Sequence, residues 1–360
     1  MRIRSTGENA YFAAANSAEG FVCDYSACFD VGRIDRVYAV KGGPGTGKSR
    51  FLRDVANAAR EEGFVCEYVY CSSDPDSLDG VILQRSGRGI ALLDATAPHV
   101  YEPKLPGARE ELVNLGVFWD ADALERKRAE IELLQERKSR AYRRAYRYLA
   151  AAGALTEARD LLVEPYLCTD AVRRLAESLA EEIGSDGAFS EQTVRMGSIG
   201  MQGRVYLDTY LAHASEIVVL RDCRGIAWRV MAELREIARS RGIAIRVSYD
   251  PLMPRRIDAI SFLSSGRTFA VLPRGACLLP HRAVSVRRLL RVEEMGEVRR
   301  ECNALSRSVR AAVGGAVLAL RDVRRAHFAL EEIYSATMNF SAKESFTKIF
   351  CRELLATLRE

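Results

Sequence analysis

Short apolar runs alternate with helical patterns in the first third of the chain. Residues 37–40, 64–71 and 89–93 are apolar and read as three buried strands, and apolar side chains recur at helical spacing between positions 51 and 59. Strands that alternate with helices in this way predict an α/β domain with a parallel sheet, whose ligand binds at the carboxyl ends of the strands.

Two further segments have the pattern of amphipathic helices. Residues 121–149 are rich in Arg and Lys and carry an apolar stripe, and residues 168–183 form a second stripe with Thr169 or Asp170 as the expected N-cap. We expect these segments to form a helical hairpin that projects from the sheet domain, with a counterpart at about 285–358.

The sequence contains an internal repeat. A shift of 179 positions aligns residues 36–98 with 215–277 without a gap, and it places Ser86-Gly87-Arg88 on Ser265-Gly266-Arg267. We therefore expect two copies of one unit. The first spans 1–187, with a core at 1–106 and a helical part at 107–187, and the second spans 188–360, with a core at 188–283 and a helical part at 284–360.

Between the first strand and the first helix lies a complete phosphate-binding loop pattern, G-x-x-x-x-G-K-[ST]. Its glycines let successive amide groups approach a polyphosphate, and the following helix adds the positive end of its dipole. Lys48 supplies a charge for the β and γ phosphates, and Ser49 supplies a hydroxyl for Mg²⁺. The predicted nucleotide-binding residues are Gly42, Gly43, Pro44, Gly45, Thr46, Gly47, Lys48, Ser49 and Arg50.

The second copy has lost this pattern. In the same register Gly47 becomes Ile226, Lys48 becomes Ala227 and Ser49 becomes Trp228. We expect the C-terminal unit to be degenerate, retaining the fold without the phosphate site.

Asp94 ends the third predicted strand after four apolar residues and is the leading Walker-B candidate, a carboxylate that holds Mg²⁺ opposite Ser49. The alternative is that Asp94 caps the following turn. Ala95 stands where many related ATPases have a glutamate that activates water, so we expect slow hydrolysis or another base.

That base is predicted among the polar residues near the same sheet edge. Asp74 follows the second strand and has no counterpart in the second copy, and His99 lies five residues after Asp94. Asp79 is a third candidate, but it recurs as Asp258 in the degenerate copy, which favours a structural role. His99 has the alternative of a solvated loop histidine.

Composition agrees with two ordinary globular domains in a chain of 360 residues. No apolar run approaches a membrane span and no secretory signal is recognised, so the cytoplasm is the expected location. The nine cysteines lack C-x-x-C spacing. Arginines 140, 143, 144 and 147 alternate with tyrosines, but interleaved glutamates favour a solvated helix face over a nucleic-acid surface.

Four strings carry a resemblance to a known family: Lys41 to Ser49, Cys71 to Gly80, Asp94 to His99, and Asn114-Leu115-Gly116. With them the chain resembles a little-characterised bacterial family of tandem P-loop ATPase-like proteins over nearly its whole length. The resemblance implies two P-loop domains, each followed by helices, and ATP binding by the first. The second loop, which has lost the motif, departs from the family pattern and puts a mechanism with two nucleotide sites in doubt.

The absence of an Asn-Lys-x-Asp motif favours ATP over GTP, so ATP and Mg²⁺ are the expected cofactors. The first hypothesis is a slow ATPase or nucleotide-dependent switch, in which contacts of the γ-phosphate order residues 72–80. A kinase-like phosphotransferase acting on a nucleotide or small molecule is an alternative, and a non-enzymatic scaffold stabilised by nucleotide is another. The expected partners are an adenine nucleotide and either a protein or a small-molecule acceptor.

Overall fold

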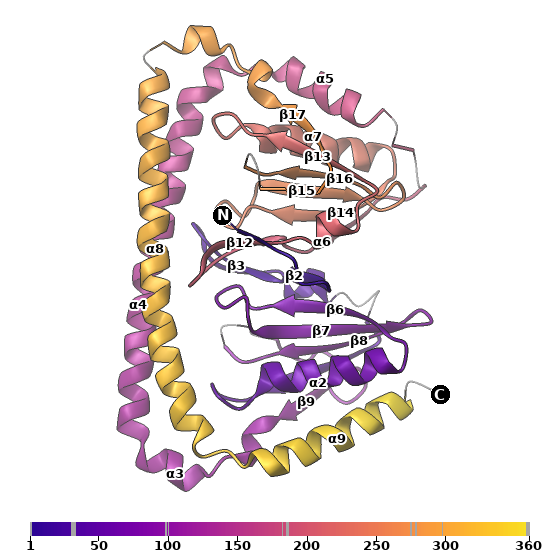
Figure 1. The fold of residues 1–360 in the computed structure, drawn as a ribbon, viewed down its shortest axis with the longest axis vertical. Helices are drawn as coiled ribbons and strands as arrows, with labels where there is room; N and C mark the ends of the chain where they lie inside the picture. Colours follow the sequence, from indigo (N-terminus) through magenta and orange to yellow (C-terminus); the bar gives the residue numbers. More distant parts are fainter. Residues whose placement is uncertain are drawn as a thin grey trace. The chain divides into compact units, whose positions relative to one another are not determined.

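The computed structural model describes residues 2–29, 34–97, 99, 101–181, 183–184, 187–273, 276–277, 279–296 and 298–357. Pro98, which belongs to one of the quoted strings, and Glu182, which belongs to the expected second helix, lie outside these residues. The chain divides into two compact units (Figure 1). Unit 1 contains residues 1–6, 11–28 and 145–318, and unit 2 contains 7–10, 29–144 and 319–360, so each unit draws on both halves of the sequence.

Unit 2 carries the phosphate-loop segment and is built on a six-stranded sheet with the order β2-β6-β7-β8-β5-β9. Three strands lie where the apolar runs predict them. The strands are β2 (Asn9–Phe12), β5 (Arg36–Lys41), β6 (Val65–Tyr70), β7 (Leu78–Arg85), β8 (Arg88–Asp94) and β9 (Glu110–Asn114).

The sheet is mixed, so the expected parallel sheet is wrong. Strand β5 is parallel to β8 and β9, but β7 is antiparallel to both β6 and β8. The reason is that β7 was not foreseen: it follows β6 after a short turn in which Ser77 N donates to Asp74 O at 3.0 Å. Ser86 and Gly87, both with positive φ, then join β7 to β8 in a two-residue hairpin. Two consecutive strands that are joined by a short turn, without a crossover helix, pair antiparallel.

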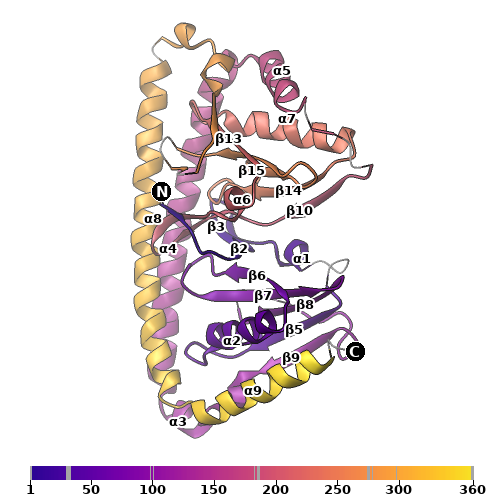
Figure 2. The same cartoon turned by 45° about the vertical axis from the view of Figure 1, so that its right-hand side comes forward.

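Helix α2 (Lys48–Glu61) packs on this sheet and places its apolar stripe in the core (Figure 2). Its other neighbour is α9 (Phe340–Thr357), from the far end of the chain. The ring of Phe51, fully buried on α2, lies 5.2 Å from the ring of Phe350 and 6.2 Å from that of Phe346. Helix α2 is therefore covered on two sides by apolar contacts.

Unit 1 repeats the sheet topology, with the order β10-β14-β15-β16-β13-β17 and the antiparallel pairs at the equivalent places. Smaller sheets, β1-β12-β11 and β3-β4, belong to the same unit. The strands are β1 (Arg2–Arg4), β3 (Ala14–Ser17), β4 (Gly20–Cys23), β10 (Ser190–Thr193), β11 (Gly197–Gly200), β12 (Gly203–Leu207), β13 (Glu216–Arg221), β14 (Ala244–Tyr249), β15 (Ile257–Phe262), β16 (Arg267–Val271) and β17 (Arg282–Ser285). The helices within this unit are α1 (Tyr25–Cys28), α5 (Thr169–Leu179), α6 (Thr209–Ala212) and α7 (Ala227–Ser240).

The last helix of each half packs in the unit that holds the core of the other half. Helix α5 contacts α7 in unit 1, and α9 contacts α2 in unit 2. Matching main-chain hydrogen bonds hold the two exchanged segments: Cys168 N donates to Leu289 O, and Asn339 N donates to Phe118 O, each at 2.9 Å. This exchange replaces the helical hairpin that was expected after each core.

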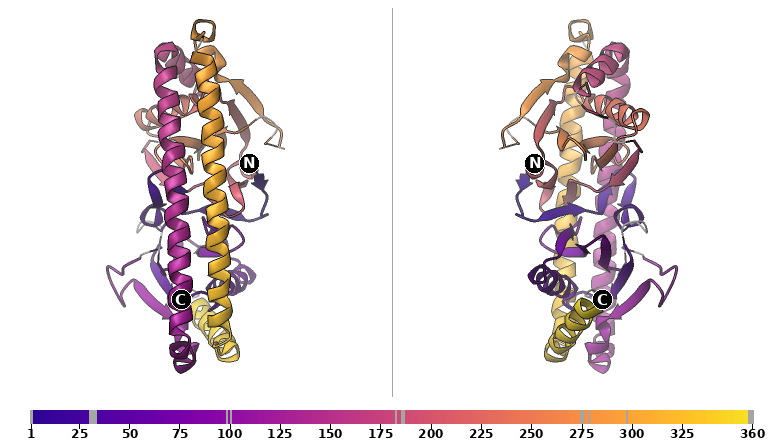
Figure 3. Two further views of the ribbon diagram at one scale, coloured as in Figure 1. Left: turned by 90° about the vertical axis from the view of Figure 1, so that its left-hand side faces the viewer. Right: turned by 90° about the vertical axis from the view of Figure 1, so that its right-hand side faces the viewer.

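The helix expected at 121–149 extends to Val163, and a second long helix lies within the segment 285–358. Helix α4 (Arg128–Val163), preceded by the short α3 (Ala121–Arg126), and helix α8 (Val298–Ser335) lie side by side (Figure 3). In unit 2, Lys138 Nζ on α4 lies 3.4 Å from His327 Nδ1 on α8. None of the described helices has both the length and the apolar character needed to cross a membrane.

Replacing Phe350 by alanine tests the contact between α9 and α2. We expect Phe350→Ala to lower the free energy of unfolding by about 2 kcal/mol, because it removes a half-buried ring from the cluster around Phe51. Ile349→Ala, at an exposed position of the same helix, is the control and should cost about 0.5 kcal/mol or less. Urea unfolding measures both, and equal losses would contradict the packing described for α9.

Candidate functional site

The phosphate-loop segment in unit 2 has the backbone that an anion cradle needs. It connects the end of β5 to the first turn of α2, and Gly45 and Gly47 adopt φ values of 72° and 75°. Gly47 is the N-cap of α2 in the left-handed conformation, which glycine adopts without strain. The first turn of a helix leaves N–H groups without intrahelical partners, so this end of α2 favours an anion.

Lys48 lies over the loop that precedes it. Its Nζ donates to Gly42 O at 2.8 Å and to Gly43 O at 2.9 Å, and it lies 3.6 Å from Asp94 Oδ2. The ammonium group is thus held between the loop carbonyls and a carboxylate. This arrangement places the Lys48 charge where phosphate oxygens would meet it.

Ser49 and Asp94 stand at neighbouring positions of the same sheet edge. Ser49 Oγ accepts a hydrogen bond from Leu78 N at 2.9 Å, which ties the start of β7 to the loop. Asp94 Oδ1 accepts from Thr96 N at 2.8 Å, so the carboxylate also caps the turn. Burial raises the pKa of the Asp94 carboxyl, and the charge of Lys48 opposes that rise. Both predicted metal ligands therefore belong to the loop site, together with Lys48.

Asp74 and His99, the two predicted bases, are in different environments. Asp74 caps a turn by accepting from Asp76 N at 3.2 Å, and burial raises the pKa of its carboxyl. His99 is buried, and its Nε2 lies 3.0 Å from Asp79 Oδ2. Asp79 therefore pairs with His99.

Cys71 completes a small group with Asp79 and His99. One potential ligand atom from each of the three residues lies within 4.8 Å of the others, a grouping that can hold a metal ion. Burial raises the pKa of the Cys71 thiol to about 11, so without a cation the group favours a neutral thiol.

The other predicted loop residues divide into two sets. Thr46 is buried, and its Oγ1 donates to Gly43 O at 3.0 Å within the loop. Gly42, Gly43 and Pro44 are half-buried. Arg50 points outward on α2, where its side chain is 74% exposed and 3.9 Å from Asp54.

The end of α8 covers the loop, and this was not foreseen from the sequence. Ser335 Oγ donates to Gly45 O at 3.1 Å, and a Cβ atom on Gly45 would lie 2.6 Å from the carbonyl oxygen of Glu331. The glycine at position 45 is therefore required by this close approach as well as by its positive φ. The sequence pattern of α8 carries no signal that separates these residues from the rest of a charged helix.

Glu331 brings a carboxylate to the cradle. Burial would raise the pKa of this carboxyl, but the hydrogen bond with His327, the charges of His327 and Lys48, and the amide of Gly45 outweigh burial and lower it. His327 Nε2 lies 3.4 Å from Glu331 Oε1. Next to them on α4, burial and the charge of Lys48 lower the pKa of the Lys138 ammonium. The site therefore contains ionisable groups from both long helices.

The second loop, in unit 1, is closed by its own side chain. Asp222 accepts from Gly225 N through Oδ2 and from Ala227 N through Oδ1, each at 2.8 Å. A carboxylate within the loop thus satisfies the amides at the start of α7. Trp228 takes the place of Ser49, and the guanidinium of Arg229 lies 4.5 Å from the centre of the Trp228 ring.

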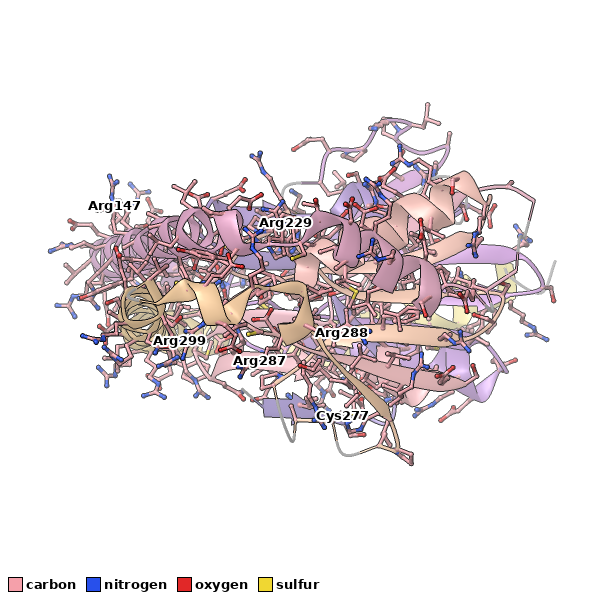
Figure 4. The ribbon with its side chains drawn as sticks, turned by 90° about the horizontal axis from the view of Figure 1, so that it is seen from above. Arg147, Arg229, Cys277, Arg287, Arg288 and Arg299 are labelled. Atoms are coloured by element: carbon pink, nitrogen blue, oxygen red, sulfur yellow. The ribbon has the colours of Figure 1, made fainter. Side chains whose placement is uncertain are left out.

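Tyr142 and Tyr146 of α4 are half-buried, whereas Tyr148 is exposed and Arg147 points outward (Figure 4). Tyr146 Oη donates to Asn16 Oδ1 at 2.8 Å, and Tyr142 Oη lies 3.4 Å from Ser73 Oγ. The hydroxyls of Tyr142 and Tyr146 are thus engaged within the protein, whereas the side chain of Arg147 is solvated.

Comparisons with protein-family models, with curated proteins and with solved structures gave no match to this chain. The resemblance stated from the sequence motifs therefore stays a prediction, and the site has to be interpreted from its own geometry.

Asp258 of unit 1, the counterpart of Asp79, provides a test by pH. Burial and the charge of Asp250 raise the pKa of its carboxyl to about 7. A hydrogen bond with Ser248 and the charges of Arg195 and Arg204 oppose this rise with smaller effects. The folded protein thus binds this proton more tightly than the unfolded chain. The stabilisation it gives is complete below the unfolded pKa of about 4 and is lost as the pH rises through 7.

We expect the free energy of unfolding of the native protein to fall, relative to that of Asp258→Asn, by up to about 1.4 kcal/mol per pH unit between pH 4 and 7. Urea unfolding at pH 5, 6, 7 and 8 measures the difference. Glu177→Gln, which alters an exposed carboxylate in unit 1, is the control. A constant difference between the native protein and Asp258→Asn would contradict the raised pKa.

Proposed function

We propose that unit 2 binds ATP with Mg²⁺ at residues 42–49 and acts as a slow ATPase or nucleotide-dependent switch. The observation that carries the proposal is the convergence of Lys48, Ser49 and Asp94 at one sheet edge, beside a loop with two positive-φ glycines. Lys48 and the loop amides are suited to phosphate oxygens, and Ser49 with Asp94 to Mg²⁺. Bound Mg²⁺ would neutralise phosphate charge.

The surroundings of Asp94 favour slow turnover. The next residue, Ala95, is buried, and its N–H donates to Val40 O at 2.9 Å, so no carboxylate stands at that position to activate water. Asp74 and Glu331 are the carboxylates whose environments are coupled to the site.

Two contacts support a switch. The hydrogen bond from Leu78 N to Ser49 Oγ links the metal-ligand hydroxyl to the segment 72–80. Glu331 interacts with the amide of Gly45 and with Lys48, the groups that a phosphate needs. Two anions cannot share this cradle without repulsion, so nucleotide binding should displace the Glu331 side chain and disturb the end of α8.

Lys48→Ala tests the binding site. We expect it to weaken ATP binding by on the order of 10- to 100-fold, because it removes charge-assisted hydrogen bonds to phosphate. Isothermal titration calorimetry with ATP and Mg²⁺ measures the loss, and phosphate release by the same two proteins tests turnover. Arg60→Ala, an exposed cation at the end of α2, is the control. Unchanged affinity in Lys48→Ala would refute the proposed site.

Glu331→Gln tests the competition for the cradle. We expect it to tighten ATP binding by about tenfold, which corresponds to relief of about 1.4 kcal/mol of repulsion. Glu332→Gln, at the exposed neighbouring position, should leave the affinity within about twofold. The same calorimetry measures both, and weaker binding by Glu331→Gln would show that Glu331 does not compete with phosphate.

A further inference from the structure

A lysine in the first turn of α9 is buried without an ion-pair partner. Lys343 is only 2% exposed. Within the part of the chain that the structure describes, no carboxylate lies within ion-pair distance of its Nζ, and this atom makes no hydrogen bond. Burial lowers the pKa of the ammonium, and the charges of Asp54 and Glu344 oppose this only in part. Because lysines are almost never fully buried unless they are paired, Lys343 lacks the anion that its burial requires.

The ammonium group of Lys343 lies at the end of the phosphate loop. A Cβ atom on Gly47, the N-cap of α2, would lie 3.5 Å from Lys343 Nζ. This Nζ is not one of the buried nitrogens that lack contact with solvent, so a ligand can reach it. The positive charge is thus beside the helix end that favours an anion.

Lys48 and Lys343 lie at opposite ends of the loop. Lys48 Nζ donates to the carbonyl oxygens of Gly42 and Gly43, whereas Lys343 Nζ is next to Gly47. The loop pattern assigns the first lysine to the β and γ phosphates of a nucleotide. A cation at the other end of the loop is then suited to the remaining phosphate, the α-phosphate.

The corresponding helix of unit 1 has an apolar residue at this position. Helices α5 and α9 are the exchanged segments, and they begin at Thr169 and Phe340, so Val172 and Lys343 are the fourth residue of each. Val172 is 4% exposed and belongs to the apolar core of its unit. An apolar side chain is therefore enough for packing at this position. Of the two units, the one with the complete loop pattern has the lysine.

We propose that Lys343 is a nucleotide ligand, whose ammonium group donates a hydrogen bond to the α-phosphate of the nucleotide bound at residues 42–49. This inference rests on the function proposed above for unit 2. The α-phosphate supplies the anion that Lys343 lacks, and the last helix of the chain thereby completes a site whose other ligands come from its first hundred residues.

Lys343→Met tests this contact, because methionine keeps an unbranched apolar side chain and removes the charge. In calorimetric titrations of the full-length protein with ATP and Mg²⁺, we expect about tenfold weaker binding than in the native protein. Inorganic tripolyphosphate with Mg²⁺ should show a loss of the same size, since the contact is with phosphate and not with the nucleoside. Lys348→Met, which removes an exposed charge from the same helix, is the control and should leave both affinities within about twofold.

Melting without nucleotide separates a ligand contact from a structural one. We expect Lys343→Met to melt at the same temperature as the native protein or higher, because it replaces a buried charge by an apolar side chain. A lower melting temperature would show that the lysine is structural and would overturn the inference.

The titrations distinguish this inference from the function on which it rests. If the native protein does not bind ATP, the function proposed for unit 2 fails and the inference fails with it. If the native protein binds ATP and Lys343→Met binds it equally well, the role of Lys343 is overturned and the proposed function stands. A loss of affinity for ATP without a loss for tripolyphosphate would also overturn the contact with phosphate.

Discussion

The burial of helix α2 between its sheet and helix α9 is the contact on which the first site depends. Phe51 is fully buried and meets the rings of Phe346 and Phe350, which belong to the last helix of the chain. Since the phosphate-loop segment is the connection between β5 and α2, its shape depends on how α2 is held. A phosphate-loop sequence pattern is local, yet here the helix that follows it is held by residues far away in the sequence. The end of α8 extends this dependence, because Ser335 bonds directly to Gly45.

The two units share a sheet topology, but the backbone amides of their loops interact with carboxylates from different places. A glycine-rich turn before a helix exposes amides that attract an anion. In unit 1 this demand is met by Asp222, three residues before Gly225, so the partner is part of the loop and always present. In unit 2 the nearby carboxylate is Glu331, which belongs to another helix rather than to the loop. The substitution of Lys48 by Ala227 is only part of the divergence between the copies, because the loop of unit 1 is also closed from within.

Much of unit 2 was predictable from local patterns, and its main errors have physical causes. Strands β5, β6 and β8, helix α2 and the loop follow from apolar runs, helical spacing and glycine content. Strand β7 was missed because its first residues continue a segment rich in Asp and Ser, in which Asp79 is buried and lies 3.0 Å from His99. The exchange of α5 and α9 is not visible in the sequence because an amphipathic stripe specifies that a face is buried, not which surface buries it. Glu331 and Lys138 were missed for a related reason. The sequence of a long charged helix does not show which of its charged residues lie next to a site in the folded protein.

These features bear on what a nucleotide at the first loop could accomplish. A fast ATPase needs a carboxylate already aimed at water when the phosphates are bound, and Ala95 leaves the usual position without one. If the proposed nucleotide site is correct, Glu331 cannot take that role from its present position, because its carboxylate interacts with Lys48 and the amide of Gly45 and a bound phosphate would first have to displace it. On the proposal that nucleotide binds here, part of its binding free energy would go into moving the end of α8, which would lower the affinity but couple occupancy to conformation. A site built in this way is better suited to reporting the presence of nucleotide than to rapid turnover.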